Sequence, residues 1–390
     1  MKKLLIVNNN MKIGGVQKSL YNLLWSISDQ YDITLFLFAP IGEYMDNLPE
    51  RVHVCSCDSL FRYLGVGQRE CANNLHDRLI RGFLACICKL LGRSAVMPLL
   101  LCSQKPLPAY YDCAISYLHN GNPTHFYGGV NEFVLKKTNA ARRIAFLHCD
   151  YLKCGANHRE NNDAYRAFDL IAACSDGCRR SFVQAMPELS AKCMTVPNFH
   201  RCDEIRNLAK QQTYVYASEF LHVIMVGRLA HEKGIDRAIR AIGFACAQGV
   251  PVKLHLIGTG SMEKALHELV CTLMLDDTVV FHGSQNNPYR FMCHADLLLM
   301  TSWHEAAPMV IDEARVLSLP VFSVKTTSSD EMVSECGCGW VCENDQTALN
   351  TALTAVLKAP ERIQAIRTHL SECHFGNENA ETAFAALAGR

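Results

Sequence analysis

Short runs of aliphatic and β-branched residues alternate along the chain with longer amphipathic stretches. In the first half of the chain, these runs occupy residues 4–7, 33–38, 113–117, 144–147 and 170–173. Short apolar runs of this kind are typical of buried strands in a parallel sheet, and the amphipathic stretches between them supply crossover helices. The first half therefore predicts a doubly wound α/β domain.

A polar stretch over residues 201–212 interrupts the alternation, which then resumes with apolar runs at 222–226, 253–257, 278–281, 297–300 and 320–324. We therefore expect two Rossmann-like domains, residues 1–199 and 200–374. An alanine-rich helix over about 375–390 is expected to pack back on the first domain. Ligands of open α/β sheets bind outside the carboxyl ends of the strands, so the functional residues are expected in the loops that follow the strands.

Composition narrows the classes of protein that this pattern allows. The chain has 390 residues, of which 49% are hydrophobic, and this provides enough apolar surface for two cores. Lys and Arg together number 38, as do Asp and Glu, so no basic excess favours nucleic acid as a partner.

Targeting signals and cysteine spacing indicate a compartment. The apolar run at 4–7 is shorter than a signal-peptide core, and no stretch of about 18 apolar residues predicts a spanning helix. The 20 cysteines are scattered through apolar runs without a Cys-x-x-Cys pair, which favours reduced thiols over a disulfide framework or a zinc site. We expect a cytoplasmic protein without a bound metal.

The most informative local pattern is a strand, a loop and a helix over residues 297–314. Pro308 suits the first turn of the helix, so Glu305 is expected just before the helix and Glu313 about a turn and a half inside it. Backbone amides near Ala307 at a helix N-terminus bind phosphate, and the carboxylates can accept hydrogen bonds from sugar hydroxyls. Acidic residues are also common near helix N-termini for electrostatic reasons alone, and the two interpretations are equally supported.

A second pattern follows the first strand of the second domain. Arg228 and Lys233 bracket a turn in residues 226–236, where two cations can neutralise a diphosphate leaving group without a metal. The alternative is a solvated loop in which these cations pair with Glu232 or Asp236. The segment Gly258-Thr259-Gly260, after the next strand, lacks the third glycine of a dinucleotide fingerprint and indicates only a tight turn.

Two features of the first domain are candidates for substrate contact. Gly14 and Gly15 lie between the first strand and its helix, where the backbone can approach a ligand, or where the turn itself requires glycine. His148 ends the strand at 144–147, and a neutral imidazole there can orient a hydroxyl or the reacting centre. A purely structural histidine is an equal alternative.

Taken together, these motifs resemble those of glycosyltransferase family 4, the retaining, metal-independent transferases of GT-B fold. The resemblance covers nearly the whole chain. It is most specific in the second domain, where Gly-Arg-Leu-x-x-x-Lys-Gly, Leu-Ile-Gly-x-Gly and Glu-x7-Glu occur in the family's order. It implies an α/β protein in which two Rossmann-like domains face each other across a deep cleft.

The resemblance also implies roles for matching positions in the second domain. Arg228 and Lys233 would hold the donor diphosphate, Glu305 would contact the transferred sugar, and Glu313 would bind the ribose. Ala307 and Pro308, with the remaining backbone amides of the loop, would complete the donor site.

In the first domain, Gly14 and Gly15 resemble the family's glycine loop near donor and acceptor, and His148 matches the histidine that faces the transferred sugar. The catalytic residues implied are thus His148 and Glu305. The nucleotide-sugar is a substrate, and no cofactor or metal is expected.

Two departures from the family's pattern affect the expected site. The usual Gly-Gly pair after residue 322 is replaced by residues 323–331 without glycine, so contacts to the base and ribose differ here. The common Gly-Phe-Gly between Glu305 and Pro308 is replaced by Ala306 and Ala307, which changes the shape of the sugar pocket.

The segment 78–105 contains five basic residues and no acidic one, interleaved with large apolar residues. This composition fits an amphipathic segment on an anionic membrane, but it also fits crossover helices with one side on the sheet, and we favour the crossover helices. A membrane contact would make the protein peripheral at the inner face of the cytoplasmic membrane and its acceptor lipid-linked.

The function predicted first is transfer of a hexose or N-acetylhexosamine from a UDP- or GDP-sugar to a glycan acceptor, in capsule, O-antigen or exopolysaccharide biosynthesis. Two alternatives remain: a nucleotide-sugar 2-epimerase, which needs acid–base groups facing C2 of the sugar, and a non-catalytic partner in a glycan-assembly complex. A nicotinamide-dependent dehydrogenase is least favoured, because the first turns lack Gly-x-Gly-x-x-Gly.

Overall fold

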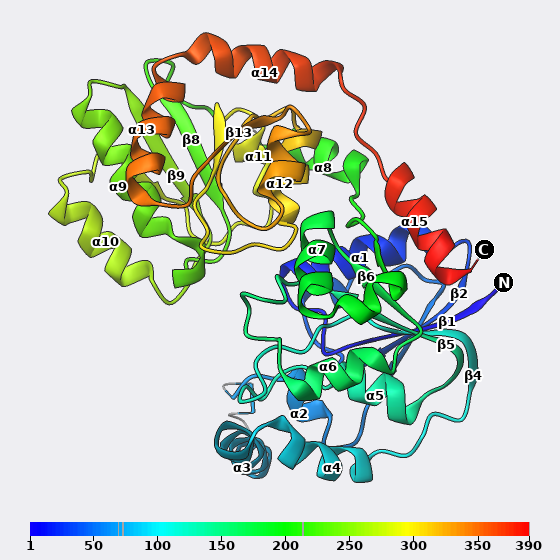
Figure 1. The fold of residues 1–390 in the computed structure, drawn as a ribbon. Coiled ribbons are helices and arrows are strands. Elements are labelled where there is room, and N and C mark those ends of the chain that lie inside the picture. The colour runs from blue at the N-terminus through cyan, green and yellow to red at the C-terminus, as the bar shows by residue number, and fades with distance from the viewer. Residues whose placement is uncertain (69, 72–73, 213, 390) are drawn as a thin grey trace. The chain divides into compact units, whose positions relative to one another are not determined.

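The computed structural model describes residues 1–68, 70–71, 74–212 and 214–389 and divides into two compact units (Figure 1). Unit 1 comprises Met1–Phe199 and Asn377–Arg390, and unit 2 comprises His200–Gly376. Arg390, the last residue of the helix predicted over 375–390, lies outside the described residues.

Unit 1 contains a parallel sheet with strand order β3-β2-β1-β4-β5-β6-β7. Its strands are β1 (Lys3–Asn8), β2 (Asp32–Leu37), β3 (Val52–Ser56), β4 (Tyr110–Ser116), β5 (Asn139–Leu147), β6 (Leu170–Ala173) and β7 (Cys193–Thr195). Its helices are α1 (Gly15–Ile27), α2 (Arg62–Gly65), α3 (Leu75–Leu91), α4 (Arg93–Ser103), α5 (Val130–Lys137), α6 (Arg159–Arg166), α7 (Asp176–Ala185) and α15 (Glu378–Ala388), with short 3₁₀ turns η1 (Glu43–Met45) and η2 (Pro187–Lys192).

The C-terminal helix α15 belongs to the core of unit 1. Its residue Phe384 is 1% exposed, and its ring centroid lies 5.9 Å from that of Tyr31 and 6.2 Å from that of Phe199. The chain therefore returns from unit 2 to unit 1 because the apolar face of α15 completes a core that begins with β1 and α1.

Unit 2 contains a second parallel sheet, with strand order β10-β9-β8-β11-β12-β13. Its strands are β8 (Leu221–Val226), β9 (Val252–Ile257), β10 (Val279–Phe281), β11 (Leu297–Met300), β12 (Val321–Val324) and β13 (Gly339–Cys342). Its helices are α8 (Cys202–Ala209), α9 (Ile235–Ala247), α10 (Glu263–Thr272), α11 (Tyr289–Met292), α12 (Met309–Val316), α13 (Gln346–Leu357) and α14 (Pro360–Glu372), with the short turns η3 (His231–Lys233) and η4 (Asp330–Ser334).

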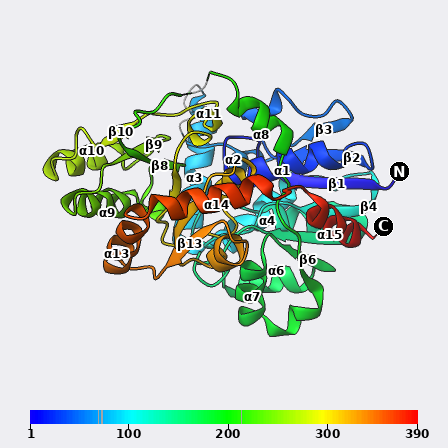
Figure 2. The same cartoon turned by 90° about the horizontal axis from the view of Figure 1, so that it is seen from above.

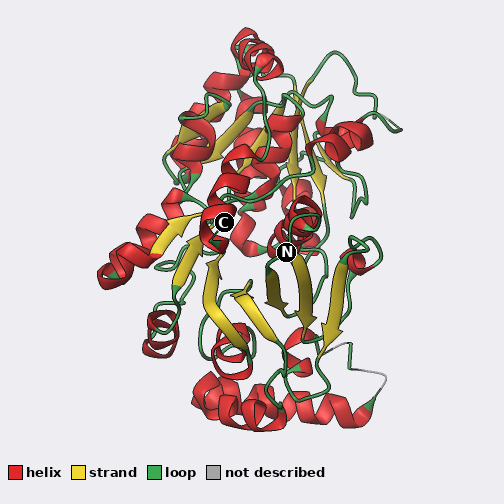
Figure 3. Cartoon of the chain, turned by 90° about the vertical axis from the view of Figure 1, so that its right-hand side faces the viewer, coloured by secondary structure: helices red, strands yellow, loops and turns green. Residues whose placement is uncertain are grey.

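The sheet of unit 2 has a separate hydrophobic cluster on each face. Helices α9, α10 and α13 bury their apolar residues on one face (Figure 2), and α8, α11 and α12 bury theirs on the other. Helix α14 contributes Ile363 to the first cluster and Leu370 to the second. In both units the strands thus form a middle layer between helices (Figure 3). The observed fold, two parallel-sheet α/β units, is the predicted fold class.

The apolar pattern located the inner strands but missed the edge strands β3, β7 and β13. The side chains of β3 are mostly exposed, β7 has three residues, and all four residues of β13 are only partly buried. Edge strands cover little apolar surface, so they carry no continuous apolar run. One detail was also wrong: Pro308 is the residue before α12 rather than part of its first turn.

Candidate functional site

The order of strands in unit 2 reverses between β8 and β11. The chain proceeds outward from β8 through β9 to β10, then crosses to β11 and proceeds outward again through β12 to β13. At such a switch point, the loops that leave the two central strands diverge and open a crevice at their carboxyl ends, where ligands bind. Arg228 and Lys233 lie in the loop after β8, and Glu305 lies in the loop after β11.

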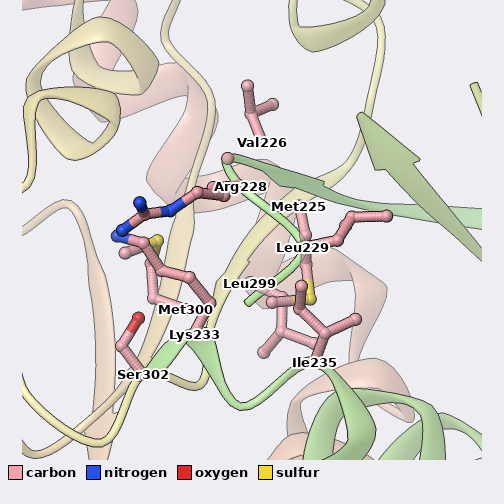
Figure 4. A pocket seen from close by; sticks show the side chains of 10 residues that line it. Met225, Val226, Arg228, Leu229, Lys233, Ile235, Leu299, Met300 and Ser302 are labelled. Carbon is pink, nitrogen blue, oxygen red and sulfur yellow. The ribbon is translucent and has the colours of Figure 1, made fainter. Parts of the chain in front are cut away.

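A small pocket lies at this position (Figure 4). Arg228 and Lys233 reach it from the loop after β8, and Ser302 reaches it from the loop after β11. The side chains of Met225 and Leu299 lie on the opposite side of the pocket and close it against the core. The pocket therefore combines cationic groups with an apolar floor, as small-molecule sites commonly do.

Lys233 and Glu305 form the central contact of the site. Lys233 Nζ lies 2.6 Å from Glu305 Oε1, and Ser302 Oγ donates to the same oxygen at 2.8 Å. The Glu305 side chain is 14% exposed and that of Lys233 is 30% exposed, so the pair is only partly screened by solvent. The structure therefore joins these two predicted site residues in one ion pair.

Arg228 has a different environment from Lys233. Its Nη2 donates to Glu232 Oε1 at 2.6 Å within the same loop, and the Arg228 side chain is 70% exposed. This is the alternative pairing that the sequence left open for Arg228. An exposed pair of this kind contributes little to stability, so Arg228 can change partner at small cost.

Backbone contacts hold the two loops together. Gly234 has φ 59°, and a Cβ atom on it would lie 2.3 Å from the carbonyl oxygen of Thr301. Thr301 Oγ1 donates to the backbone oxygen of Gly234 at 2.8 Å, and the Trp303 amide donates to the backbone oxygen of Glu232 at 3.0 Å. Glycine is required here because the loops that carry Lys233 and Glu305 are in direct backbone contact.

Arg237 and Asn344 support this junction, and sequence reasoning missed both. Arg237 is 3% exposed. Its Nη1 donates to the backbone oxygen of Thr301 at 3.2 Å and to Asn344 Oδ1 at 2.6 Å. Its guanidinium carbon lies 4.2 Å from the ring centroid of Trp303. An arginine one turn into a helix carries no spacing signal, because its partners come from distant loops.

The Gly258-Thr259-Gly260 segment serves the same pair of loops. A Cβ atom on Gly258 would lie 1.9 Å from the oxygen of Gly227, and one on Gly260 would lie 2.2 Å from the oxygen of Leu229. The Leu229 amide also donates to the Thr259 oxygen at 2.9 Å. The tight turn predicted there lies against the neighbouring loop that carries Arg228.

The remaining predicted donor residues lie around α12. Glu313 is in the helix and 3% exposed, and Pro308 precedes the helix. Ala307 is partly buried against the apolar cluster on that face of the sheet. The structure thus places Glu305, Ala307, Pro308 and Glu313 along one loop and the helix that follows it, and Glu305 forms the ion pair with Lys233.

In unit 1, the two predicted glycines begin α1. A Cβ atom on Gly15 would have no neighbour within 4 Å, and one on Gly14 would meet only the side chain of Gln17 at 2.6 Å. The φ of Gly14 is 178°, which is extended backbone open to any residue. The fold of unit 1 therefore does not require glycine at either position, and space is left beside the backbone.

His148 lies just beyond β5, and a second histidine, His119, lies just beyond β4. The two strands pair in register, which brings both histidines to the same edge of the sheet. Burial, and to a smaller extent His119, lowers the pKa of His148 to about 3, and burial lowers the pKa of His119 to about 4. Both imidazoles are thus neutral near pH 7.

Each of these histidines has one buried ring nitrogen without a hydrogen-bond partner in the described part of the chain, Nε2 in His148 and Nδ1 in His119. The His148 ring also packs against Tyr117, with centroids 4.8 Å apart. A neutral ring held by stacking with an unused nitrogen can accept or donate a hydrogen bond to a hydroxyl. Sequence reasoning missed His119, although its place after an apolar run was a usable signal.

The described residues contain no group of three or more His, Cys, Asp or Glu side chains placed to hold a metal ion. They also contain no helix that is long and apolar enough to cross a membrane.

Known proteins resemble this chain in sequence and in fold. Residues 210–369 match the family model "Glycosyl transferases group 1". The chain is 29% identical over 164 residues to an uncharacterised glycosyltransferase of Methanocaldococcus jannaschii (41% of this chain, 40% of the relative), and 31% identical over 144 residues to the colanic acid biosynthesis glycosyltransferase WcaL of Escherichia coli (35% and 36%). The matches thus span well under half the length of these relatives.

Among solved structures, Anabaena HepE in complex with UDP and glucose superposes with a TM-score of 0.70, at 18% identity and over 100% of both chains. The chain therefore has the GT-B fold of these structures, two parallel-sheet α/β units. The similarity to the group 1 glycosyltransferases covers residues 210–369, which lie in unit 2.

Proposed function

We propose that this protein transfers a hexose or N-acetylhexosamine from a UDP- or GDP-sugar to a glycan acceptor, with retention of anomeric configuration. The observation that carries the proposal is the Lys233–Glu305 pair, 2.6 Å apart, at the switch point of the unit 2 sheet. The role of WcaL in colanic acid synthesis supports a place in surface polysaccharide biosynthesis. A membrane-bound, lipid-linked acceptor is part of the proposal.

In this proposal the chain's own cations replace a metal ion. Lys233 and Arg228 stabilise the charge that develops on the nucleoside diphosphate as the bond to the sugar breaks. Glu305 accepts hydrogen bonds from hydroxyls of the transferred sugar. Lys233 and Ser302 both donate to its Oε1, which leaves Oε2 for the ligand. Glu313 binds the ribose, and backbone amides near Ala307 and Pro308 face the phosphates.

Unit 1 contributes the neutral imidazole of His148 and the open backbone at Gly14 and Gly15. A neutral imidazole accepts or donates a hydrogen bond at the reacting sugar without adding charge, and the depressed pKa of His148 supports this role. The absence of side chains at the two glycines leaves room for donor and acceptor. Neither role requires a cofactor.

The central test is donor turnover by single and double variants at the Lys233–Glu305 pair. Lys233→Ala and Glu305→Gln are each expected to lower kcat about 100-fold, by analogy with removal of one group that stabilises a transition-state charge. Lys264→Ala and Glu268→Gln are matched controls, because that exposed pair in unit 2 is 3.9 Å apart and lies in α10. Rates unchanged by either site variant would refute the proposal.

The double variant separates two roles of Glu305. If Glu305 only positions Lys233, then Glu305→Gln has no further effect in the Lys233→Ala background. If it also contacts the sugar, as proposed, the two effects on the free energy of activation largely add. Donor release without acceptor, measured as free UDP or GDP, gives the same comparison without knowledge of the acceptor.

A 2-epimerase of the same fold is the main alternative reaction. The paired edge histidines His119 and His148 are its best support, since epimerisation needs two acid–base groups. Incubation of the enzyme with UDP-N-acetylglucosamine in the absence of acceptor distinguishes the two: net formation of the 2-epimer would establish the alternative. A nucleotide panel that gave no rise in Tm would instead support a non-catalytic partner.

A further inference from the structure

Helix α3 of unit 1 exposes an unusual amount of apolar surface. Leu75, Leu79, Phe83, Leu90 and Leu91 have exposed fractions of 69, 63, 64, 75 and 70%. No other helix in the described residues has more than one large apolar side chain that is exposed. Exposed apolar side chains scattered singly need no explanation, but a group on one element indicates an interaction surface.

Four of these residues, together with Cys86, form a stripe along one side of the helix, and Leu91 lies outside this stripe. Leu75, Leu79, Phe83, Cys86 and Leu90 are separated by three or four residues, so they follow each other along one helical face. All five are exposed. The buried residues of α3, Leu84 and Cys88, lie on the opposite face. The helix thus has two apolar sides. One side packs on the protein, and the other is uncovered.

The position of α3 leaves this stripe accessible within unit 1. The helix packs against α4, and α4 packs in turn against α5, so α3 lies on the outside of the helical layer (Figure 1). We define the α3 surface as the stripe of Leu75, Leu79, Phe83, Cys86 and Leu90.

Basic residues accompany the α3 surface. Arg78 and Lys89 are exposed, and their positions along α3 place them together on one flank of the stripe. The acidic residue of the helix, Asp77, is held by Arg62 at 2.6 Å, and no acidic residue occurs from residue 78 to residue 105. The surface therefore presents apolar groups bordered by positive charge.

We infer that the α3 surface is a docking site for an anionic lipid bilayer, with α3 lying in the interface plane. Apolar side chains that enter the acyl boundary and cations that meet anionic headgroups are the two contributions such a helix needs. A second copy of this chain fits less well, because two such faces would bring like charges together. The inference rests on the proposed function only for its consequence, that the acceptor is presented at the membrane.

Co-sedimentation of the full chain with vesicles tests the inference. Vesicles of phosphatidylcholine alone are compared with vesicles that also contain phosphatidylglycerol, at low and at high salt. We expect binding to the anionic vesicles that weakens with salt, because the cationic contribution is screened. Equal binding to both vesicle types, or binding to neither, would overturn the inference.

Variants on the exposed face assign the binding to α3. Arg78→Gln with Lys89→Gln is expected to weaken binding about 25-fold, from about fivefold for each cation. Leu79→Ser with Leu90→Ser is expected to weaken it at least about tenfold. The matched controls are Lys264→Gln and Met274→Ser, whose side chains in unit 2 are 91% and 88% exposed. If the serine variant failed to fold, the charge variant would still decide the question.

Two further measurements separate the possible failures. Sedimentation velocity of the free protein detects self-association, and a dimer that the Leu79→Ser and Leu90→Ser substitutions abolish would assign the surface to a second copy and overturn the inference. Donor turnover without acceptor is expected to be unchanged by all α3 variants, and vesicle binding is expected to be unchanged by Lys233→Ala. Loss of one property without the other therefore distinguishes this inference from the proposed transferase site.

Discussion

Three histidines form a hydrogen-bonded row across three neighbouring strands of unit 2. His222 in β8, His255 in β9 and His282 just after β10 are linked by contacts of 2.9 Å, from His222 Nδ1 to His255 Nε2, and 3.0 Å, from His255 Nδ1 to His282 Nε2. His222 Nε2 lies 2.7 Å from the carbonyl oxygen of Ala217. Because a carbonyl only accepts, this end of the row fixes which nitrogens carry hydrogen along its length.

The row permits one neutral arrangement. His222 donates to Ala217 through Nε2, accepts from His255 at Nδ1, and His255 in turn accepts from His282. In this arrangement, an additional proton on His255 Nδ1 would face the Nε2–H group of His282. Burial, followed by the neighbouring histidines and Lys253, lowers the pKa of His255 to about 3.

We predict from this shift that unit 2 loses stability in mild acid. The pKa of an unfolded histidine is about 6.5, so below that pH the unfolded chain binds a proton that folded His255 does not. The stability contribution is therefore complete above about pH 6.5 and is lost as the pH falls toward 3. At about 1.36 kcal/mol per pH unit, the loss from His255 is about 2 kcal/mol by pH 5 and roughly 5 kcal/mol in full.

Urea unfolding at about pH 7.5 and about pH 5 measures the loss. The chain has three tryptophans, and Trp303 and Trp340 are in unit 2, so a Trp25→Phe background makes tryptophan fluorescence a probe of unit 2 alone. His255→Gln replaces the imidazole by an amide that can still donate and accept. The free energy of unfolding differs between the two pH values, and this difference is expected to shrink by about 2 kcal/mol in this variant. His294→Gln, at an exposed position, is the control. An equal loss of stability in the His255→Gln variant and its parent would refute the reasoning.

The remaining predictions concern residues that shape the site. Gly258→Ala is expected to lower the free energy of unfolding by about 2 kcal/mol or more, because its Cβ atom would lie 1.9 Å from the Gly227 carbonyl oxygen. Gly15→Ala, whose Cβ atom has no neighbour within 4 Å, is expected to leave Tm unchanged and to lower transferase activity. Equal Tm values for the two variants would contradict this reasoning. Arg237→Lys is expected to cost about 1–3 kcal/mol and to raise KM for the donor, because lysine cannot bond both the Thr301 oxygen and Asn344 while stacking on Trp303. Thermal melts and initial rates measure both effects, and an Arg237→Lys variant with parental KM would exclude a role in positioning the loop.

The residues of the site that sequence reasoning found are those whose position follows from topology. Lys233 and Glu305 each follow a central strand, and parallel strands bring their carboxyl ends to one edge, so their meeting was predictable from the order of apolar runs. The tight turn at Gly258 was also recognised, and the structure shows that its neighbour is the Gly227 loop.

The residues that were missed depend on contacts between distant segments. Arg237 and Asn344 are more than a hundred residues apart and meet at 2.6 Å beneath the loop that carries Trp303. His119 lies at the same edge of the sheet as His148 through the register of β4 with β5, and that register is a property of the folded sheet. Among strands, β3 and β13 were missed because their partly exposed side chains produce no apolar run.

The two cations of the site are both neutralised by acids of the chain, and the difference between those pairs defines their roles. Arg228 and Glu232 form an exposed pair of the kind that contributes about 1 kcal/mol or less, so a diphosphate can displace Glu232 with little loss. Lys233 is held by Glu305, which Ser302 fixes in turn, and all three are anchored by loops in backbone contact. In the proposed reaction, Lys233 is therefore the pre-organised cation and Arg228 the one that moves. Because Glu305 already compensates Lys233, we propose that it acts as an orienting acceptor for hydroxyls rather than as a free nucleophile.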